Sequence, residues 1–162
     1  LRDFFQRKYR NLSQITAHFS FSILILSILF NNIFSSEVIT NLKINETYQA
    51  QNLKINFESI EQENKQNFKA IKGKFIVEDQ SGLIEVMQPE LRIYNQPNIV
   101  TSEADIKTNI FTDKFMTMNY VQNQDYFNIR YQVKPFMIWI WISTILLCLS
   151  GCLSLIRKKY EN

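Results

Sequence analysis

Two long apolar segments constrain the fold of this chain more than any other feature. Residues 15–34 and 136–156 contain no Asp, Glu, Lys or Arg. Each has about the twenty residues that a helix rising about 1.5 Å per residue needs to cross the hydrocarbon core of a bilayer. We therefore expect an integral membrane protein whose two transmembrane helices occupy residues 15–34 and 136–156.

The two expected spans differ in polarity. The second, FMIWIWISTILLCLSGCLSLI, is apolar on every face, opens with Trp139 and Trp141 as a membrane interface favours, and is followed by three basic residues. The first, ITAHFSFSILILSILFNNIF, carries four Ser or Thr residues, two Asn residues and His18. Such polar groups are costly in lipid unless a neighbouring helix satisfies them. We therefore expect further helices beside the first span.

Charge is sorted along the chain. Seven basic and two acidic residues lie in the segments 1–14 and 157–162, so a net charge of −2 remains between the spans when the whole chain carries +3. The positive-inside rule then places both termini on the cytoplasmic side, or its organellar equivalent, and the intervening segment on the other side. The basic excess reflects this topology, and no nucleic-acid partner is expected.

Composition and cysteine placement add smaller expectations. Asn, Ile, Lys, Phe and Tyr are frequent, whereas Gly and Pro occur three times each, a bias that AT-rich codons produce and that indicates an organellar gene. No signal-peptide cleavage pattern precedes the first span. Because the chain begins with Leu1, we expect processing, an unusual start codon or one piece of a longer polypeptide. Cys148 and Cys152 share one face of the second span and are interpreted as apolar packing residues, with metal binding as the alternative.

Between the spans, continuous apolarity changes to the alternation that is typical of half-buried strands. We expect strands at residues 53–57, 75–77 and 127–133, with Phe57, Phe75, Ile129 and Tyr131 buried. The stretch KGKFIVEDQSGLIEVM predicts a hairpin that turns at residues 80–82, where glycine accepts positive φ. About a hundred residues suffice for one small β domain with its own core.

Two further runs complete the expected β domain. ELRIYNQP predicts another strand, stopped by Pro97, and TSEADIKTN predicts a turn or a single helical turn capped by Thr101 or Ser102. The fold class is therefore membrane α + β, with two transmembrane helices flanking a small β-rich soluble domain. The expected segments are a basic N-terminal segment (1–14), a span (15–34), the β-rich domain (35–135), a second span (136–156) and a basic tail (157–162), with both basic segments on the cytoplasmic side or its organellar equivalent.

His18 is the one residue that the sequence singles out for chemistry. The segment 35–135 has no histidine, cysteine, G-x-S-x-G motif or glycine-rich phosphate loop, so catalysis by that segment alone is not expected. An ionisable residue within a membrane span is by default a functional hypothesis. For His18 three readings stay open: an interhelical hydrogen bond, ligation of haem or another metal, and proton transfer.

The order of features resembles the C-terminal quarter of the CcmF-type cytochrome c haem lyases. The stretch IRYQVKPFMIWIWIS is similar to the family's V-R-L-Y-x-K-P-F-x-R-W-I-W ending, with Ile138 where an arginine is expected. AHFSFSILILSILFNN resembles a family helix through Ala17, His18 and Asn32. Weaker blocks match through Tyr94, Thr101 or Ser102, Glu103, Ala104 and Ile106, through IFTDKF, and through SGCLSLIRKKY.

This resemblance implies a specific role for His18. In the family the matching histidine is one axial ligand of a b-type haem, so His18 is expected to ligate haem b that is shared with another chain, which supplies the second ligand. The tryptophan-rich WWD segment that presents substrate haem is absent from this sequence, as are the family helix's glycines and the G-P-N motif of its soluble loop. The chain then resembles the C-terminal fragment of a haem lyase whose gene is split in a mitochondrial genome.

Two functions follow as alternatives. In the first, the chain is the C-terminal subunit of a split haem lyase in the mitochondrial inner membrane, with its β domain in the intermembrane space. Its partners are then N-terminal haem lyase fragments, apocytochrome c, other maturation or respiratory inner-membrane subunits, and membrane lipid. In the second, the chain is a non-catalytic structural subunit of an inner-membrane assembly derived from that fragment.

Overall fold

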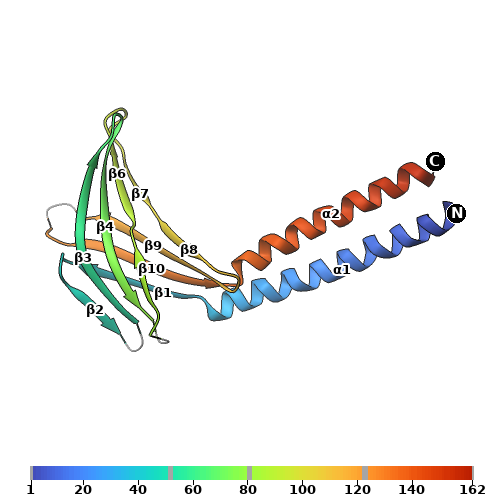
Figure 1. Ribbon diagram of the computed structural model, residues 1–162, viewed down its shortest axis with the longest axis horizontal. Helices are drawn as coiled ribbons and strands as arrows, with labels where there is room; N and C mark the ends of the chain where they lie inside the picture. The colour runs from blue at the N-terminus through green and yellow to red at the C-terminus, as the bar shows by residue number, and fades with distance from the viewer. Residues whose placement is uncertain (1, 51–52, 80–81, 122–123, 162) are drawn as a thin grey trace. The chain divides into compact units, whose positions relative to one another are not determined.

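The computed structural model describes residues 2–50, 53–79, 82–121 and 124–161, and of residues 2–11 and 156–161 it describes the backbone alone. Within these ranges the chain forms helix α1 (Arg2–Phe34), ten strands and helix α2 (Met137–Glu161) (Figure 1). The residues group into a helical unit and a β unit. The predicted architecture of two apolar helices flanking a β-rich domain is confirmed.

The helical unit consists of α1, α2, the short segment Asn109–Asp113 and the residues from Lys134 up to the start of α2. The two helices lie side by side, with their free ends together, so they are antiparallel (Figure 1). Leu12–Phe34 and Met137–Leu155 are long and apolar enough to cross a membrane. Where the bilayer begins and ends along each helix stays a prediction, with 15–34 and 136–156 as the expected spans.

The β unit, residues 36–108 and 114–133, contains two sheets. The four-stranded sheet has the order β1 (Ser36–Leu42), β10 (Phe127–Pro135), β9 (Thr112–Tyr120) and β8 (Asp105–Thr108). The six-stranded sheet has the order β2 (Thr47–Ala50), β3 (Leu53–Asn64), β4 (Phe68–Glu78), β6 (Glu90–Tyr94) and β7 (Val100–Glu103), and β5 (Ile84–Met87) also pairs with β4.

The core of the β unit lies between the two sheets, because inward-facing residues of both contribute to one buried cluster. Phe57 and Phe75 are paired across β3 and β4, and their rings stack with centroids 4.3 Å apart. The four side chains that the alternation predicts to be buried are buried, which confirms that prediction. The cluster consists of Leu42, Ile55, Phe57, Phe75, Val77, Met87, Leu91, Met116, Met118, Ile129 and Tyr131.

Three predicted strands and the predicted hairpin are confirmed. The expected strands fall within β3, β4 and β10, and β4 pairs antiparallel with β5. Gly82 has the positive φ of 74° that the turn was expected to need, and its N–H donates to the Asp79 carbonyl. Gln80 and Ser81, the other two expected turn residues, lie outside the described residues. The strand predicted from ELRIYNQP is β6, which ends at Tyr94.

The prediction of a turn or helical turn at TSEADIKTN is wrong. This run forms strands β7 and β8, and the chain crosses from the six-stranded sheet to the four-stranded sheet at Ala104. Thr101 and Ser102 cap no helix: the Ser102 hydroxyl donates to the Met118 carbonyl, and the Thr101 hydroxyl to the Glu103 carboxylate. Pairing with neighbouring strands overrides the local turn preference of these polar residues.

Candidate functional site

The contact between α1 and α2 is built from small polar residues. Ser20 and Ser27 on α1 are buried, as are Ser143 and Ser150 on α2, and each pair is seven residues apart. Seven residues are close to two helical turns, so each pair lies on one helix face. Small residues let two helix backbones approach closely in a membrane. The two spans therefore pack through these serines.

Most hydroxyls in the spans are satisfied within their own helix. Ser20 donates to the Thr16 carbonyl at 2.6 Å, Ser22 to the His18 carbonyl at 2.9 Å, and Ser143 to the Trp139 carbonyl at 2.6 Å. Such bonds to the carbonyl four residues earlier satisfy a hydroxyl without a second helix. Ser13 differs, because it donates to the Ser150 carbonyl of α2 at 3.0 Å. Because most of these serines are hydrogen-bonded within their own helix, fewer neighbouring helices are needed to satisfy them than their number suggests.

His18 lies on the face of α1 that points away from α2. It is two residues from Thr16, which is half-buried, and two from the fully buried Ser20, and two residues correspond to about 200° around a helix. The His18 side chain is exposed, and so are those of Ser22 and Asn32 along the same face. Two large apolar side chains, Ile25 and Leu29, lie exposed between them.

This face fits one side of a haem site. It offers an accessible imidazole within a candidate span, surrounded by apolar side chains that suit a porphyrin. His18 is the only histidine of the chain, so a second imidazole ligand, if a haem is bound here, would have to come from outside this sequence. Among the described residues, no three His, Cys, Asp or Glu side chains gather in a way that would hold a metal ion. Cys148 and Cys152 are exposed on α2, so they do not pack against α1.

The ends of the helices are joined by polar and aromatic contacts that the sequence did not predict. The Asn31 side-chain amide donates to the Pro135 carbonyl at 2.7 Å. Phe136, between β10 and α2, has a positive φ of 60°, which is rare for a bulky residue. Its N–H donates to the Phe111 carbonyl at 2.7 Å, and its ring lies 5.3 Å from that of Phe30. The K-P-F motif is therefore a sharp strand-to-helix turn, stabilised by contacts with the end of α1 and with the segment before β9.

An ionic cluster in the β unit is built around a buried lysine. The Lys114 ammonium on β9 lies 2.8 Å from the Glu85 carboxylate and 3.3 Å from that of Asp79, and Lys114 is only 8% exposed. Burial lowers the pKa of Lys114, but the hydrogen bonds to Glu85 and Asp79 and the charge interactions with Tyr131 and Glu85 together raise the pKa overall. Burial raises the pKa of the nearby Tyr131 phenol to about 12. The cluster ties the β4–β5 hairpin to the opposite sheet.

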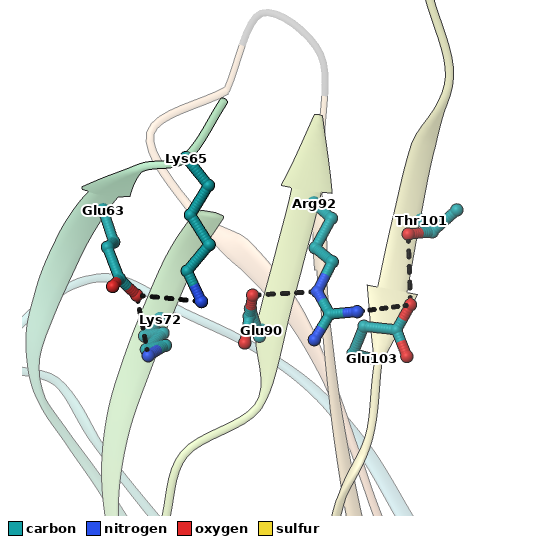
Figure 2. Close-up of polar contacts among 7 residues, drawn as sticks. All are labelled: Glu63, Lys65, Lys72, Glu90, Arg92, Thr101 and Glu103. Atoms are coloured by element: carbon teal, nitrogen blue, oxygen red, sulfur yellow. Dashed lines mark hydrogen bonds and ion pairs between the residues drawn. The ribbon is translucent and has the colours of Figure 1, made fainter. Parts of the chain in front are cut away.

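The outer face of the six-stranded sheet carries a row of paired charges (Figure 2). Glu63 lies 3.1 Å from Lys72 and 3.7 Å from Lys65, and Arg92 lies 2.9 Å from Glu90 and 3.8 Å from Glu103. The hydrogen bond from Lys72 lowers the pKa of Glu63. These charges alternate in sign and are matched to one another. They make a solvated sheet face, without the convergent carboxylates of an acid–base pair.

Comparisons with known proteins decide the family. A family model described as the CcmF C-terminal beta-sandwich matches residues 33–135. The chain belongs to the CcmF family. The cytochrome c-type biogenesis protein ccl1 of Rhodobacter capsulatus is 29% identical over 120 residues, which is 74% of this chain and 18% of that protein. CcmF of Pseudomonas aeruginosa is 22% identical over 145 residues, which is 90% of this chain and 22% of that protein.

A solved structure agrees in fold. The structure titled Cytochrome c Heme Lyase CcmF superposes with a TM-score of 0.69 at 17% identity, over 92% of this chain and 25% of that chain. The chain therefore spans about a fifth to a quarter of the length of the relatives that it matches. The resemblance inferred from the motifs is confirmed, and with it the assignment to a membrane protein family of cytochrome c biogenesis.

Proposed function

We propose that this chain supplies the C-terminal part of a cytochrome c haem lyase and that His18 is one axial ligand of a b-type haem shared with another chain. The observation that carries this proposal is the position of His18. The imidazole is exposed within a candidate span, on the face of α1 opposite α2. A histidine that served only to hold the two helices together would lie on the other face, where Ser13 bonds to Ser150.

The chain's own residues would hold and position the cofactor. His18 would coordinate the iron through an imidazole nitrogen, and Ile25 and Leu29 on the same face would exclude water. The hydrogen bond from Ser22 to the His18 carbonyl fixes the helix backbone at the ligand without occupying the ring. When bound, the b-type haem would relay electrons from a reductant toward the substrate haem and so keep that iron ferrous during thioether formation. His18 acts as a ligand in this proposal, not as an acid or base.

The remaining parts of the enzyme come from partners. N-terminal haem lyase fragments would contribute the second axial ligand and the WWD segment, and apocytochrome c would be the acceptor of the haem. The expected place is the mitochondrial inner membrane, with residues 1–14 and 157–162 in the matrix and the β domain, residues 35–135, in the intermembrane space. Composition and charge sorting support this placement. Other maturation or respiratory subunits are further candidate partners.

Cytochrome c maturation in cells that carry variants of this chain tests the proposal. His18→Ala should lower holocytochrome c and let apocytochrome c accumulate, while this chain stays in its assembly. Ser13→Ala is the matched control, because it removes an interhelical hydrogen bond on the opposite face of the same helix. Such a bond contributes about 0.6 kcal/mol, so Ser13→Ala should leave maturation unchanged.

The opposite outcome would favour the alternative function. If His18→Ala leaves holocytochrome c at its normal level, the haem-ligand role is rejected. The chain would then be better described as a non-catalytic structural subunit of an inner-membrane assembly. Loss of the whole assembly in both variants would likewise indicate a structural role for the helix and not a specific one for the imidazole.

A further inference from the structure

A short apolar turn lies at the ends of the two helices. Residues 109–111, Asn-Ile-Phe, connect β8 to β9 and belong to the helical unit. The side chains of Ile110 and Phe111 are 63% and 59% exposed. Loop tips are ordinarily polar, so an exposed apolar pair at this position is a candidate contact surface.

Contacts within the helical unit fix this turn at the level where the spans end. The Phe111 ring lies 6.2 Å from the Phe136 ring, which in turn lies 5.3 Å from the Phe30 ring in the last turns of α1. The Trp139 indole N–H, near the start of α2, donates to the Ile110 carbonyl at 2.9 Å. Trp139 at this level matches the aromatic belt of membrane proteins, in which Trp and Tyr are enriched.

The backbone of the turn is largely satisfied without water. The Asn109 side-chain oxygen accepts the N–H groups of Phe111 and Thr112 at 2.9 and 2.8 Å, and the Asn109 N–H donates to the Thr112 carbonyl at 3.0 Å. The carbonyls of Ile110 and Phe111 accept the bonds from Trp139 and Phe136. Irregular backbone enters a region of low water content only when its polar groups are paired in this way.

We propose that the 109–111 turn is a third membrane contact, with Ile110 and Phe111 inserted among lipid acyl chains just below the headgroups. The occupant of this surface is lipid because the turn is continuous with the exposed apolar ends of both spans, including Ile33, Phe34 and Trp141. Its side chains carry no charge, and its backbone is already paired. The turn thereby ties the start of β9 to the bilayer surface. This inference does not depend on haem binding.

Spin labelling tests the proposed depth. The full chain, with its native partners, is reconstituted into phosphatidylcholine–phosphatidylglycerol vesicles in a Cys148→Ala/Cys152→Ala background. A nitroxide is attached at Ile110→Cys, and accessibility to oxygen, which concentrates in lipid, is compared with accessibility to a water-soluble nickel chelate. Ile84→Cys on β5 is the matched control, because Ile84 is an equally exposed aliphatic residue, 64% exposed, in the β unit.

The proposal expects an oxygen-to-nickel accessibility ratio at residue 110 several-fold higher than at residue 84. Phe111→Cys, labelled in the same way, provides a second position should Ile110→Cys fail to assemble, and it should give the same result. A ratio at the turn equal to that at residue 84 would overturn the proposal, because the turn would then lie in water. Low accessibility to both reagents would also overturn it, because a protein partner would then cover the turn.

Discussion

Replacing Phe75 by alanine tests the packing of the β domain most sharply. Phe75 is fully buried, stacks on Phe57 with centroids 4.3 Å apart, and lies in the middle of the core between the sheets. Truncation of a buried phenylalanine costs about 3–5 kcal/mol, and the lost ring pair accounts for roughly 0.5–1.5 kcal/mol of this. A small domain is stable by about 5–15 kcal/mol, so Phe75→Ala should unfold much of the domain at moderate urea concentrations.

The assay is urea denaturation of the full chain in nanodiscs, followed by near-ultraviolet circular dichroism of the β domain. Phe68→Ala is the control: Phe68 is on the same strand but only half-buried, and its ring contacts Tyr94 and Arg92 on the outer sheet face. Phe68→Ala should lower the free energy of unfolding clearly less than Phe75→Ala does. The account of the core is refuted if the two variants lower the denaturation midpoint equally, because burial between the sheets would then not govern stability.

Three further predictions follow from the structure. Gly73→Ala should destabilise the domain by about 1–3 kcal/mol in the same assay, because a Cβ would approach the Phe75 ring to 2.6 Å and the Met118 sulfur to 2.8 Å. Gly151→Ala is the control and should be neutral, because a Cβ at that position meets no neighbour within 4 Å. Burial raises the pKa of Tyr131 from 10.0 to about 12, so its neutral phenol contributes fully to the free energy of unfolding below pH 10. About 2–3 kcal/mol of that free energy should be lost as the pH rises from 10 to 12. Tyr131→Phe should abolish this loss, which urea unfolding at several pH values measures. In inner-membrane vesicles that enclose the matrix side, added protease should cut within residues 35–135, and initial cleavage at Arg7 or Lys158 would reverse the topology.

The sequence predicts those parts of the fold in which a local pattern and the tertiary environment agree. Residues 53–57 alternate because one face of β3 packs on the opposite sheet, and charge-free stretches of about twenty residues specify the two helices. Strands β7 and β8 were missed because pairing with the adjacent strands β6 and β9 overrides the turn preference of their polar residues. Strand β9, whose Met116 and Met118 are buried, follows the same alternation, and counting period-2 matches in TDKFMTMNY could have found it.

The candidate site is only partly readable from sequence. His18 stands out because it is a lone ionisable residue in a span, but its direction relative to α2 depends on which helix face carries the buried serines. The buried Lys114 cluster joins residues 29 and 35 positions apart in the sequence, and no local motif marks it. The hydrogen bonds from Trp139 to Ile110 and from Phe136 to Phe111 also depend on tertiary structure, since they connect the start of α2 to the turn between β8 and β9.

The most direct test of the central claim is the absorption spectrum of the native assembly in its reduced state, purified with this chain and its partners. If His18 and a histidine from another chain ligate a b-type haem, the assembly should show the sharp α and β bands of a six-coordinate low-spin ferrous centre. His18→Ala should abolish those bands or shift the midpoint potential, while Ser13→Ala should leave both unchanged. An assembly without b-type haem, or an unaltered spectrum in His18→Ala, would contradict the account.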